Sequence, residues 1–287
     1  MAVDKLVDSA QLNADLTSVA NAIRTKGGTS ASLAFPAGFA EAIDALETGG
    51  SGGDLVKYYD NTMTGVFTWS TPTTLSSGNL FIPAGDNLDE ISLPNVTSLG
   101  ASNIFSYCRA KKISLPKLTT CGSSLSVFAN CRAQEVYVPL LKTITRYAFQ
   151  NCTNLTFLVL PSFTSAPSSN FDNIFAGCTS LQVIDIGAAV GKAGSSGTYS
   201  GCTALNKMIL RASSVRPLGT VAAFTNTPFA SGKAGGTLYV PRALIQDYEA
   251  ATNWSTIFSY GEGAQNQILP IEGSIYETQY ADGTPIT

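Results

Sequence analysis

Two groups of residues could carry chemistry: six cysteines, and an acidic stretch at residues 86–90 that reads Asp-Asn-Leu-Asp-Glu. Thiols form disulfides, bind metals or act as nucleophiles. The acidic stretch could in principle bind calcium, but it lacks the spacing and the glycine of an EF-hand loop, so we expect a solvated loop. The sequence has no histidine, which removes Ser-His-Asp and Cys-His catalysis and imidazole metal sites. We expect no enzyme, no cofactor and no metal.

Five of the cysteines recur at one position of a short motif, FxxC. Successive cysteines of this column lie 23, 21, 26 and 24 residues apart, a spacing typical of a solenoid, in which each repeat packs on its neighbours. The motif pairs are Phe105 and Cys108, Phe128 and Cys131, Phe149 and Cys152, Phe175 and Cys178, Tyr199 and Cys202, and Phe224 and Thr227. Threonine in the last copy indicates a small buried residue. We expect both columns to form the repeat core, with buried free thiols; disulfides or a metal site are the alternatives.

A short stretch of alternating apolar residues follows each motif, and a period of two predicts a β-strand. The residues expected to point inward are Ile91, Ile113, Val136, Leu158, Ile184, Met208 and Leu238. Cys121, in register with Leu99 and Ile144, is also expected in the core. The sequence predicts a mainly β solenoid with one short strand per repeat and about seven stacked strands.

Alternation also places a second set of residues on the outer face of these strands. The early repeats have polar residues there, whereas the later ones have apolar or aromatic residues. The candidate partner-binding residues are Tyr137, Phe157, Val159, Val183, Ile209 and Tyr239. An apolar patch on a Ser/Thr-rich surface is typical of an interface. Two alternatives stay open: an end cap or the N-terminal module covers the patch, or the register differs by one residue and exchanges the faces.

Charge and apolar content restrict the partners. The 287 residues include 17 Lys+Arg and 20 Asp+Glu, which gives a net charge of −3. A chain without a basic surface is a poor ligand for phosphate backbones, so we expect no nucleic-acid partner. There is no run of 18 apolar residues and no long apolar segment at the N-terminus. The sequence therefore predicts no transmembrane segment, no membrane insertion and no signal peptide.

The chain divides by composition into four segments. Apolar residues at helical spacing near the N-terminus predict a small α-helical hairpin, either an intramolecular pair or an attachment and oligomerisation module. A hairpin at residues 55–67 and an amphipathic C-terminal helical cap at residues 241–254 are expected to cover the edge strands. The predicted segments are the helical module 1–47, the glycine-rich linker 48–54, the solenoid with its caps 55–270, and a C-terminal tail 271–287 without assignment.

The repeats resemble the BspA-type leucine-rich repeat, whose units run as a short strand, a proline, a VTSI-like stretch and an AFxxC turn. The matching pieces are LPNVTSLG at residues 93–100, RYAFQNC at 146–152 and FAGCTSLQVIDI at 175–186. The stretch TLYVPRALIQDYEAATNWSTI is similar to the family's closing unit. Tyr199 in place of phenylalanine, and Gly187 and Arg211 in place of proline, depart from the pattern. The resemblance implies a leucine-rich-repeat-like solenoid that presents an interaction surface.

The N-terminal stretch LTSVANAIRTKGGTSASLAFPAGFAEAIDAL is similar to a module at the start of tail and baseplate-associated proteins of phages and prophages of gut Firmicutes. This resemblance implies a virion tail protein, assembled in the bacterial cytoplasm, that binds a host-cell surface protein or glycan. Residues 1–47 would then contact other tail proteins or form a homo-oligomer. A bacterial cell-surface adhesin is the alternative, and a glycan-active enzyme is a third hypothesis.

Overall fold

A computed structural model describes residues 64–286, apart from residues 79, 82–87, 122–125, 165–171, 188–191, 231 and 259–265. The chain divides after Asp54 into two units, and every described residue belongs to the second. The predicted helical module of residues 1–47 and the linker of residues 48–54 lie outside the described residues. So do the first nine residues of the hairpin predicted at residues 55–67.

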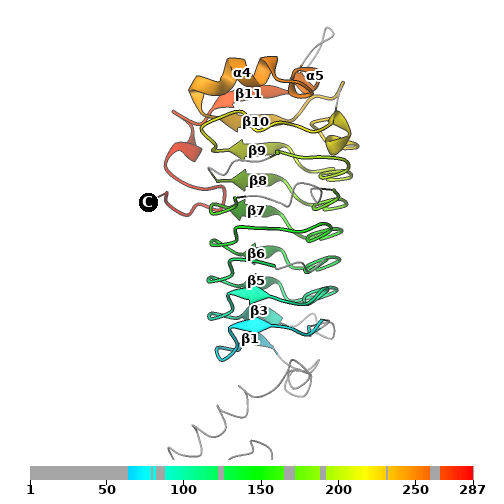
Figure 1. The fold of residues 1–287 in the computed structure, drawn as a ribbon, viewed down its shortest axis with the longest axis vertical. Helices are drawn as coiled ribbons and strands as arrows, with labels where there is room; N and C mark the ends of the chain where they lie inside the picture. The colour runs from blue at the N-terminus through cyan, green and yellow to red at the C-terminus, as the bar shows by residue number, and fades with distance from the viewer. Residues whose placement is uncertain are drawn as a thin grey trace, which may run out of the picture. The chain divides into compact units, whose positions relative to one another are not determined.

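The described residues form a mainly β solenoid whose successive turns contribute short parallel strands (Figure 1). This confirms the predicted mainly β solenoid. The first sheet contains β1 (Gly65–Thr68), β3 (Leu88–Ser92), β5 (Lys112–Ser114) and β6 (Glu135–Tyr137). The second contains β7 (Phe157–Leu160), β8 (Val183–Ile186), β9 (Lys207–Leu210), β10 (Thr237–Val240) and β11 (Gln267–Pro270). A two-stranded sheet joins β2 (Thr74–Leu75) and β4 (Ser98–Leu99).

The strand register agrees with the alternation in the sequence. Ile91 pairs with Ile113, and Ile113 with Val136, in parallel ladders. All seven residues predicted to point inward are buried, so the alternative register is wrong. The strands do not form one continuous ladder, because β6 and β7 belong to different sheets. Strand β1 pairs in parallel with β3, so it adds a further rung to the stack.

An aromatic column runs through the core. Its members are Phe81, Phe105, Phe128, Phe149, Phe175, Tyr199 and Phe224. Neighbouring rings stack with centroids 4.8 to 5.7 Å apart. Phe81 extends the column by one repeat, although it lacks the FxxC motif. Each ring is covered by the rings of adjacent repeats, so stability depends on the stack rather than on a single repeat.

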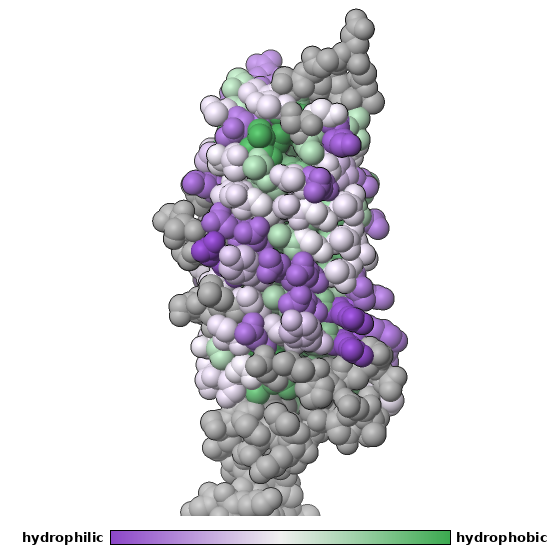
Figure 2. Space-filling model, turned by 90° about the vertical axis from the view of Figure 1, so that its right-hand side faces the viewer, coloured by the Kyte–Doolittle hydropathy of each residue, from purple (hydrophilic) through white to green (hydrophobic). Residues whose placement is uncertain are grey.

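The FxxC turns form a second ladder at the edge of the solenoid. The residue before each cysteine position has a left-handed backbone with φ between 57° and 77°. These residues are Tyr107, Asn130, Asn151, Gly177, Gly201 and Asn226. Glycine and asparagine tolerate this conformation best, which explains why they fill five of the six positions. Figure 2 shows that hydrophilic side chains gather over the middle of this edge.

The thiols of the cysteine column link neighbouring turns. Cys152 donates its S–H to the carbonyl oxygen of Phe128 at 3.0 Å, and Cys178 donates to Phe149 at 3.0 Å. Cys202 repeats the contact with Phe175. The column therefore needs a side chain that is small, apolar and able to donate a hydrogen bond.

The C-terminal cap is helical, but it is broken into short pieces. They are η2 (Arg242–Leu244), α4 (Ile245–Ala250) and α5 (Trp254–Phe258). The single helix predicted at residues 241–254 is interrupted because Ala251 is extended and Asn253 has a φ of 66°. Trp254 is buried against Phe224 at a centroid distance of 6.0 Å, which closes the aromatic column. No helix among the described residues is long and apolar enough to cross a membrane.

Candidate binding surface

The six candidate residues of the outer strand face are less exposed than the sequence predicted. Ile209 is fully buried and Val159 is 8% exposed. Tyr137, Phe157, Val183 and Tyr239 are half-buried. The prediction of one open apolar surface is therefore wrong for its C-terminal half.

The C-terminal tail, residues 271–286, covers this half of the face. Ile271 and Tyr276 form a small cluster with Ile209, and Val183 and Tyr239 pack against it. The ring of Tyr276 meets that of Tyr239 edge to face at 4.8 Å. The apolar residues of this half are thus covered by the tail, a segment that neither covering alternative had included.

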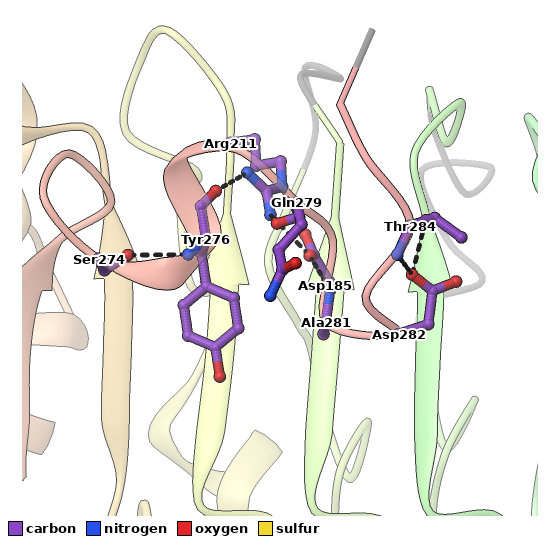
Figure 3. Close-up of polar contacts among 8 residues, drawn as sticks. All are labelled: Asp185, Arg211, Ser274, Tyr276, Gln279, Ala281, Asp282 and Thr284. Carbon is purple, nitrogen blue, oxygen red and sulfur yellow. Dashed lines mark hydrogen bonds and ion pairs between the residues drawn. The ribbon is translucent and has the colours of Figure 1, made fainter.

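A buried ion pair holds the tail to the sheet (Figure 3). Arg211 donates from Nε and Nη2 to the two carboxylate oxygens of Asp185, at 2.7 and 2.8 Å. Its other donors reach the tail carbonyls of Tyr276 at 2.7 Å and Gln279 at 3.1 Å. The N–H of Ala281 donates to Asp185 at 2.9 Å. The polar groups of the sheet are therefore satisfied by the backbone of the tail.

Burial of the ion pair removes the carboxylate of Asp185 from water, which costs free energy. Burial raises the pKa of Asp185, whereas the hydrogen bonds and charge of Arg211 lower it. A buried ion pair contributes little net stability, but removal of one partner leaves a costly unpaired charge. The pair therefore fixes where the tail lies more than it stabilises the fold.

A pocket of about 190 Å³ lies where the tip of the tail meets β6 and β7. The strands contribute Glu135, Val136, Tyr137, Phe157 and Val159, their ends contribute Pro139 and Pro161, and the tail contributes Tyr280, Asp282, Thr284 and Pro285. The pocket thus brings together three of the six candidate residues. Val183, Ile209 and Tyr239 do not line it.

The charged groups around this pocket already have protein partners. Lys112 pairs with Glu135 at 2.8 Å and lies 5.7 Å from the ring centre of Tyr137. The hydrogen bond with Glu135 is the main reason why the pKa of Lys112 is raised. The guanidinium of Arg211 lies 4.9 Å from the ring centre of Tyr280. Two of the three aromatic walls therefore each carry a cation of the protein itself.

Asp282 shapes the tip of the tail. Its carboxylate accepts hydrogen bonds from the backbone N–H and the hydroxyl of Thr284, at 2.9 and 2.6 Å. Tyr280 donates its N–H to the carbonyl of Thr284 at 2.8 Å and closes the turn. The tip is therefore a tight hydrogen-bonded turn.

The cysteines lie in the core and not at this surface. All six are buried and free, and burial raises the pKa of the Cys152 and Cys178 thiols. A thiol with a raised pKa is a poor nucleophile. Among the described residues, no group of three histidine, cysteine or acidic side chains could hold a metal ion.

The acidic stretch at residues 86–90 lies partly outside the described residues. Asp89 forms an exposed ion pair with Lys111 at 2.7 Å. Glu90 lies in β3 and faces Lys112 across the ladder. The described part of the stretch is therefore a charged surface next to lysines.

A stack of one-stranded repeats around an aromatic core, with a strand face available for contacts, defines a solenoid repeat protein. The profile of the BspA type leucine rich repeat region matches residues 79–206 and 124–234, in six copies. The match extends over more than half of the chain, which therefore belongs to the BspA-type leucine-rich repeat family. It does not include residues 1–47. No curated protein matches the chain.

Sequence reasoning missed the tail residues Tyr276, Tyr280 and Asp282. Two signals for them were present in the repeats. Asp185 is a carboxylate between the apolar residues Val159 and Ile209 of its row, and Arg211 replaces the proline that ends most strands. An acid and a base at neighbouring positions of the outer strand face can together bind the backbone of another segment, as Asp185 and Arg211 bind the tail.

Proposed function

We propose that this chain is a non-enzymatic interaction protein whose strand face, beside the tip of the tail, binds a protein or glycan on a cell surface. Family membership suggests a surface or interaction repeat protein. The observation that carries the proposal is the pocket in which Tyr137 and Phe157 of the strands meet Tyr280 of the tail. Half-buried aromatic residues in a concave site are typical of binding surfaces.

The finer proposal is a phage or prophage tail component that recognises a host-cell receptor. It rests on the similarity of residues 1–47 to the module of tail-associated proteins. That segment would attach the solenoid to other tail proteins or to further copies of this chain. The alternative is a bacterial cell-surface adhesin, which the BspA-type repeats favour.

The absence of histidine and the burial of every thiol support a role without catalysis. A glycan-active enzyme would need two carboxylates at the ligand, and Glu135 and Asp282 both line the pocket. Both are already engaged, Glu135 with Lys112 and Asp282 with Thr284. Release of reducing sugar from cell walls that disappears in Glu135→Gln would overturn the non-enzymatic proposal.

The direct test is binding of the labelled full chain to a panel of Firmicutes cells. The double variant Tyr137→Ser/Phe157→Ser should weaken binding at least about tenfold, the usual effect of removing interface aromatics. Tyr107→Asn is the matched control, because Tyr107 is 58% exposed at the FxxC edge and asparagine suits its φ of 61°. Unchanged binding by a well-folded double variant would refute the proposed surface. The proposed homo-oligomer has its own test, the mass of the full chain in solution. A mass equal to that of one chain would refute oligomerisation through residues 1–47.

A further inference from the structure

The composition of the pocket beside the tail selects among ligand classes. We infer that this pocket is a subsite for one uncharged sugar ring of a surface glycan. The inference rests on the proposed function, because it names the class of ligand that the strand face would bind. It is carried by the size of the pocket, its aromatic walls and the hydrogen-bond acceptors among its lining residues.

The size of the pocket limits the ligand to one small unit. Pockets that enclose drug-sized ligands have volumes of roughly 300 to 1,000 Å³. A volume of about 190 Å³ is smaller than this range. It suits a single six-membered ring, with the rest of a glycan lying outside along the open strand face.

The walls of the pocket offer flat apolar surfaces. Tyr137, Phe157 and Tyr280 supply aromatic rings, and Pro139 and Pro161 supply aliphatic ones. Aromatic walls attract cations as well as sugar C–H groups. Lys112 and Arg211 already lie over the rings of Tyr137 and Tyr280, at 5.7 and 4.9 Å. Both rings thus already have a cation of the protein beside them, so they do not need a lysine or arginine side chain of a partner.

The lining of the pocket includes residues with hydrogen-bond acceptors. They are Glu135, Asp282 and Thr284, whose side-chain oxygens accept hydrogen bonds. A purely apolar ligand would remove water from these groups and offer no hydrogen bond in its place. An anionic ligand would be repelled mainly by Asp282, because Glu135 is paired with Lys112. A carboxylate can accept more hydrogen bonds than Glu135 and Asp282 accept from Lys112 and Thr284. The hydroxyl groups of a neutral sugar can therefore still donate to them, and such charge-assisted bonds are strong.

The tail holds its half of the site in position before any ligand arrives. Arg211 fixes the carbonyls of Tyr276 and Gln279, and Asp185 fixes the N–H of Ala281, one residue after Tyr280. The turn at Tyr280 and Thr284 is closed by its own hydrogen bond of 2.8 Å. Preorganised groups lose little entropy on binding, so a small ligand can bind without a large interface.

The test uses ligand-observed NMR and titration calorimetry on the full chain. The neutral probes are glucose, galactose and N-acetylglucosamine; the charged probes are N-acetylneuraminic acid and the methylamide of Nα-acetyllysine. We expect saturation transfer to at least one neutral probe and to neither charged probe.

The variants test whether the pocket is the site of binding. Tyr137→Ser/Phe157→Ser should abolish the transfer. Asp282→Asn, which keeps an acceptor for Thr284, should weaken binding about tenfold through the loss of a charged acceptor. Tyr107→Asn should bind as the unaltered chain does.

Three results would overturn the inference: transfer to a charged probe alone, no transfer to any probe, or neutral-sugar binding that survives in the folded double variant. Cell binding that depends on Phe157 but is not competed by any of the three neutral sugars would also overturn it, and would leave the proposed function intact. Sugar binding at this pocket by a chain that binds no cells would support the subsite and refute the cell-surface function.

Discussion

The guanidinium of Arg211 and the carboxylate of Asp185 make two parallel hydrogen bonds, at 2.7 and 2.8 Å, between neighbouring repeats. Asp185 is fully buried, and it is buried by the tail. The pair and the tail therefore depend on each other. Without the tail, the pair would face water; without the pair, the tail backbone would lose three hydrogen bonds.

Arg211→Met should destabilise the protein by about 3–5 kcal/mol, because it leaves the charge of Asp185 buried without a partner. The free energy of unfolding, measured by urea denaturation, gives this cost. Limited proteolysis should also cut the tail faster in the variant.

The control is the double variant Asp185→Val/Arg211→Met. Valine fits a row in which Val159 and Ile209 are the cross-strand neighbours of Asp185. Replacement of both charges by apolar side chains removes the unpaired charge and should recover part of the lost stability, because the tail backbone still lacks three hydrogen bonds. A double variant as unstable as Arg211→Met would show that the unpaired charge is not the cause.

Phe149→Ala should cost about 3–5 kcal/mol, because it opens a cavity in the middle of the aromatic column. The ring of Phe149 stacks on Phe128 at 4.8 Å and on Phe175 at 5.7 Å. Thermal and urea unfolding measure the loss. Phe149→Leu, which fills more of the space, should cost clearly less; equal losses would mean that the column is not tightly packed.

Asn151→Ala should cost about 1–2 kcal/mol, because alanine is strained in a left-handed backbone. Asn151 has a φ of 57° and donates from Nδ2 to Asn130 at 3.2 Å. Asn151→Gly loses the same hydrogen bond without the strain, since glycine already fills this turn position at Gly177 and Gly201. Urea denaturation of the two variants separates the contributions. If they are equally stable, the backbone conformation has no energetic effect.

Stability should fall as the pH rises above the ordinary pKa of cysteine. Burial raises the pKa of the Cys121 thiol to about 12, whereas an unfolded cysteine ionises near pH 8.5, by its approximate reference value. The contribution of Cys121 is therefore fully present below about pH 8.5 and is lost as the pH rises toward 12, at about 1.4 kcal/mol per pH unit. Urea midpoints at pH 8 and pH 11 measure the decline.

Cys121→Ala isolates this effect. The variant lacks the thiol in both states, so its stability should fall less steeply between the same two pH values. Parallel slopes for the variant and the unaltered chain would show that Cys121 does not carry the dependence.

The repeats could be predicted from the sequence because each position recurs in a fixed environment. The spacing of Phe105, Phe128 and Phe149 predicts the solenoid, and alternation predicts that Ile113 and Val136 point inward. Phe81 was not predicted as a member of the aromatic column, because the motif around it has diverged, although it lies one period before Phe105. The left-handed turn residues were not predicted, although asparagine or glycine precedes five of the six cysteine positions.

The cover on the strand face could not be predicted in the same way. Ala281 contacts Asp185 across a separation of 96 residues, and no periodicity links the tail to the strands that it covers. Exposure of Ile209 and Val183 was inferred from the strands alone, so a segment from elsewhere in the chain could reverse it. The pocket was hidden for the same reason, because Tyr280 and Asp282 belong to that segment.

The tail also sets an order of events during synthesis. The repeats contact mainly their neighbours and can fold as they leave the ribosome, N-terminal turns first. Ile209 and Asp185 become covered only after residues 271–281 have been translated. A ribosome that stalls before that point releases a chain with a finished stack and an uncovered apolar face, the kind of surface that promotes aggregation. The tail thus distinguishes copies whose strand face is covered from copies whose face is open.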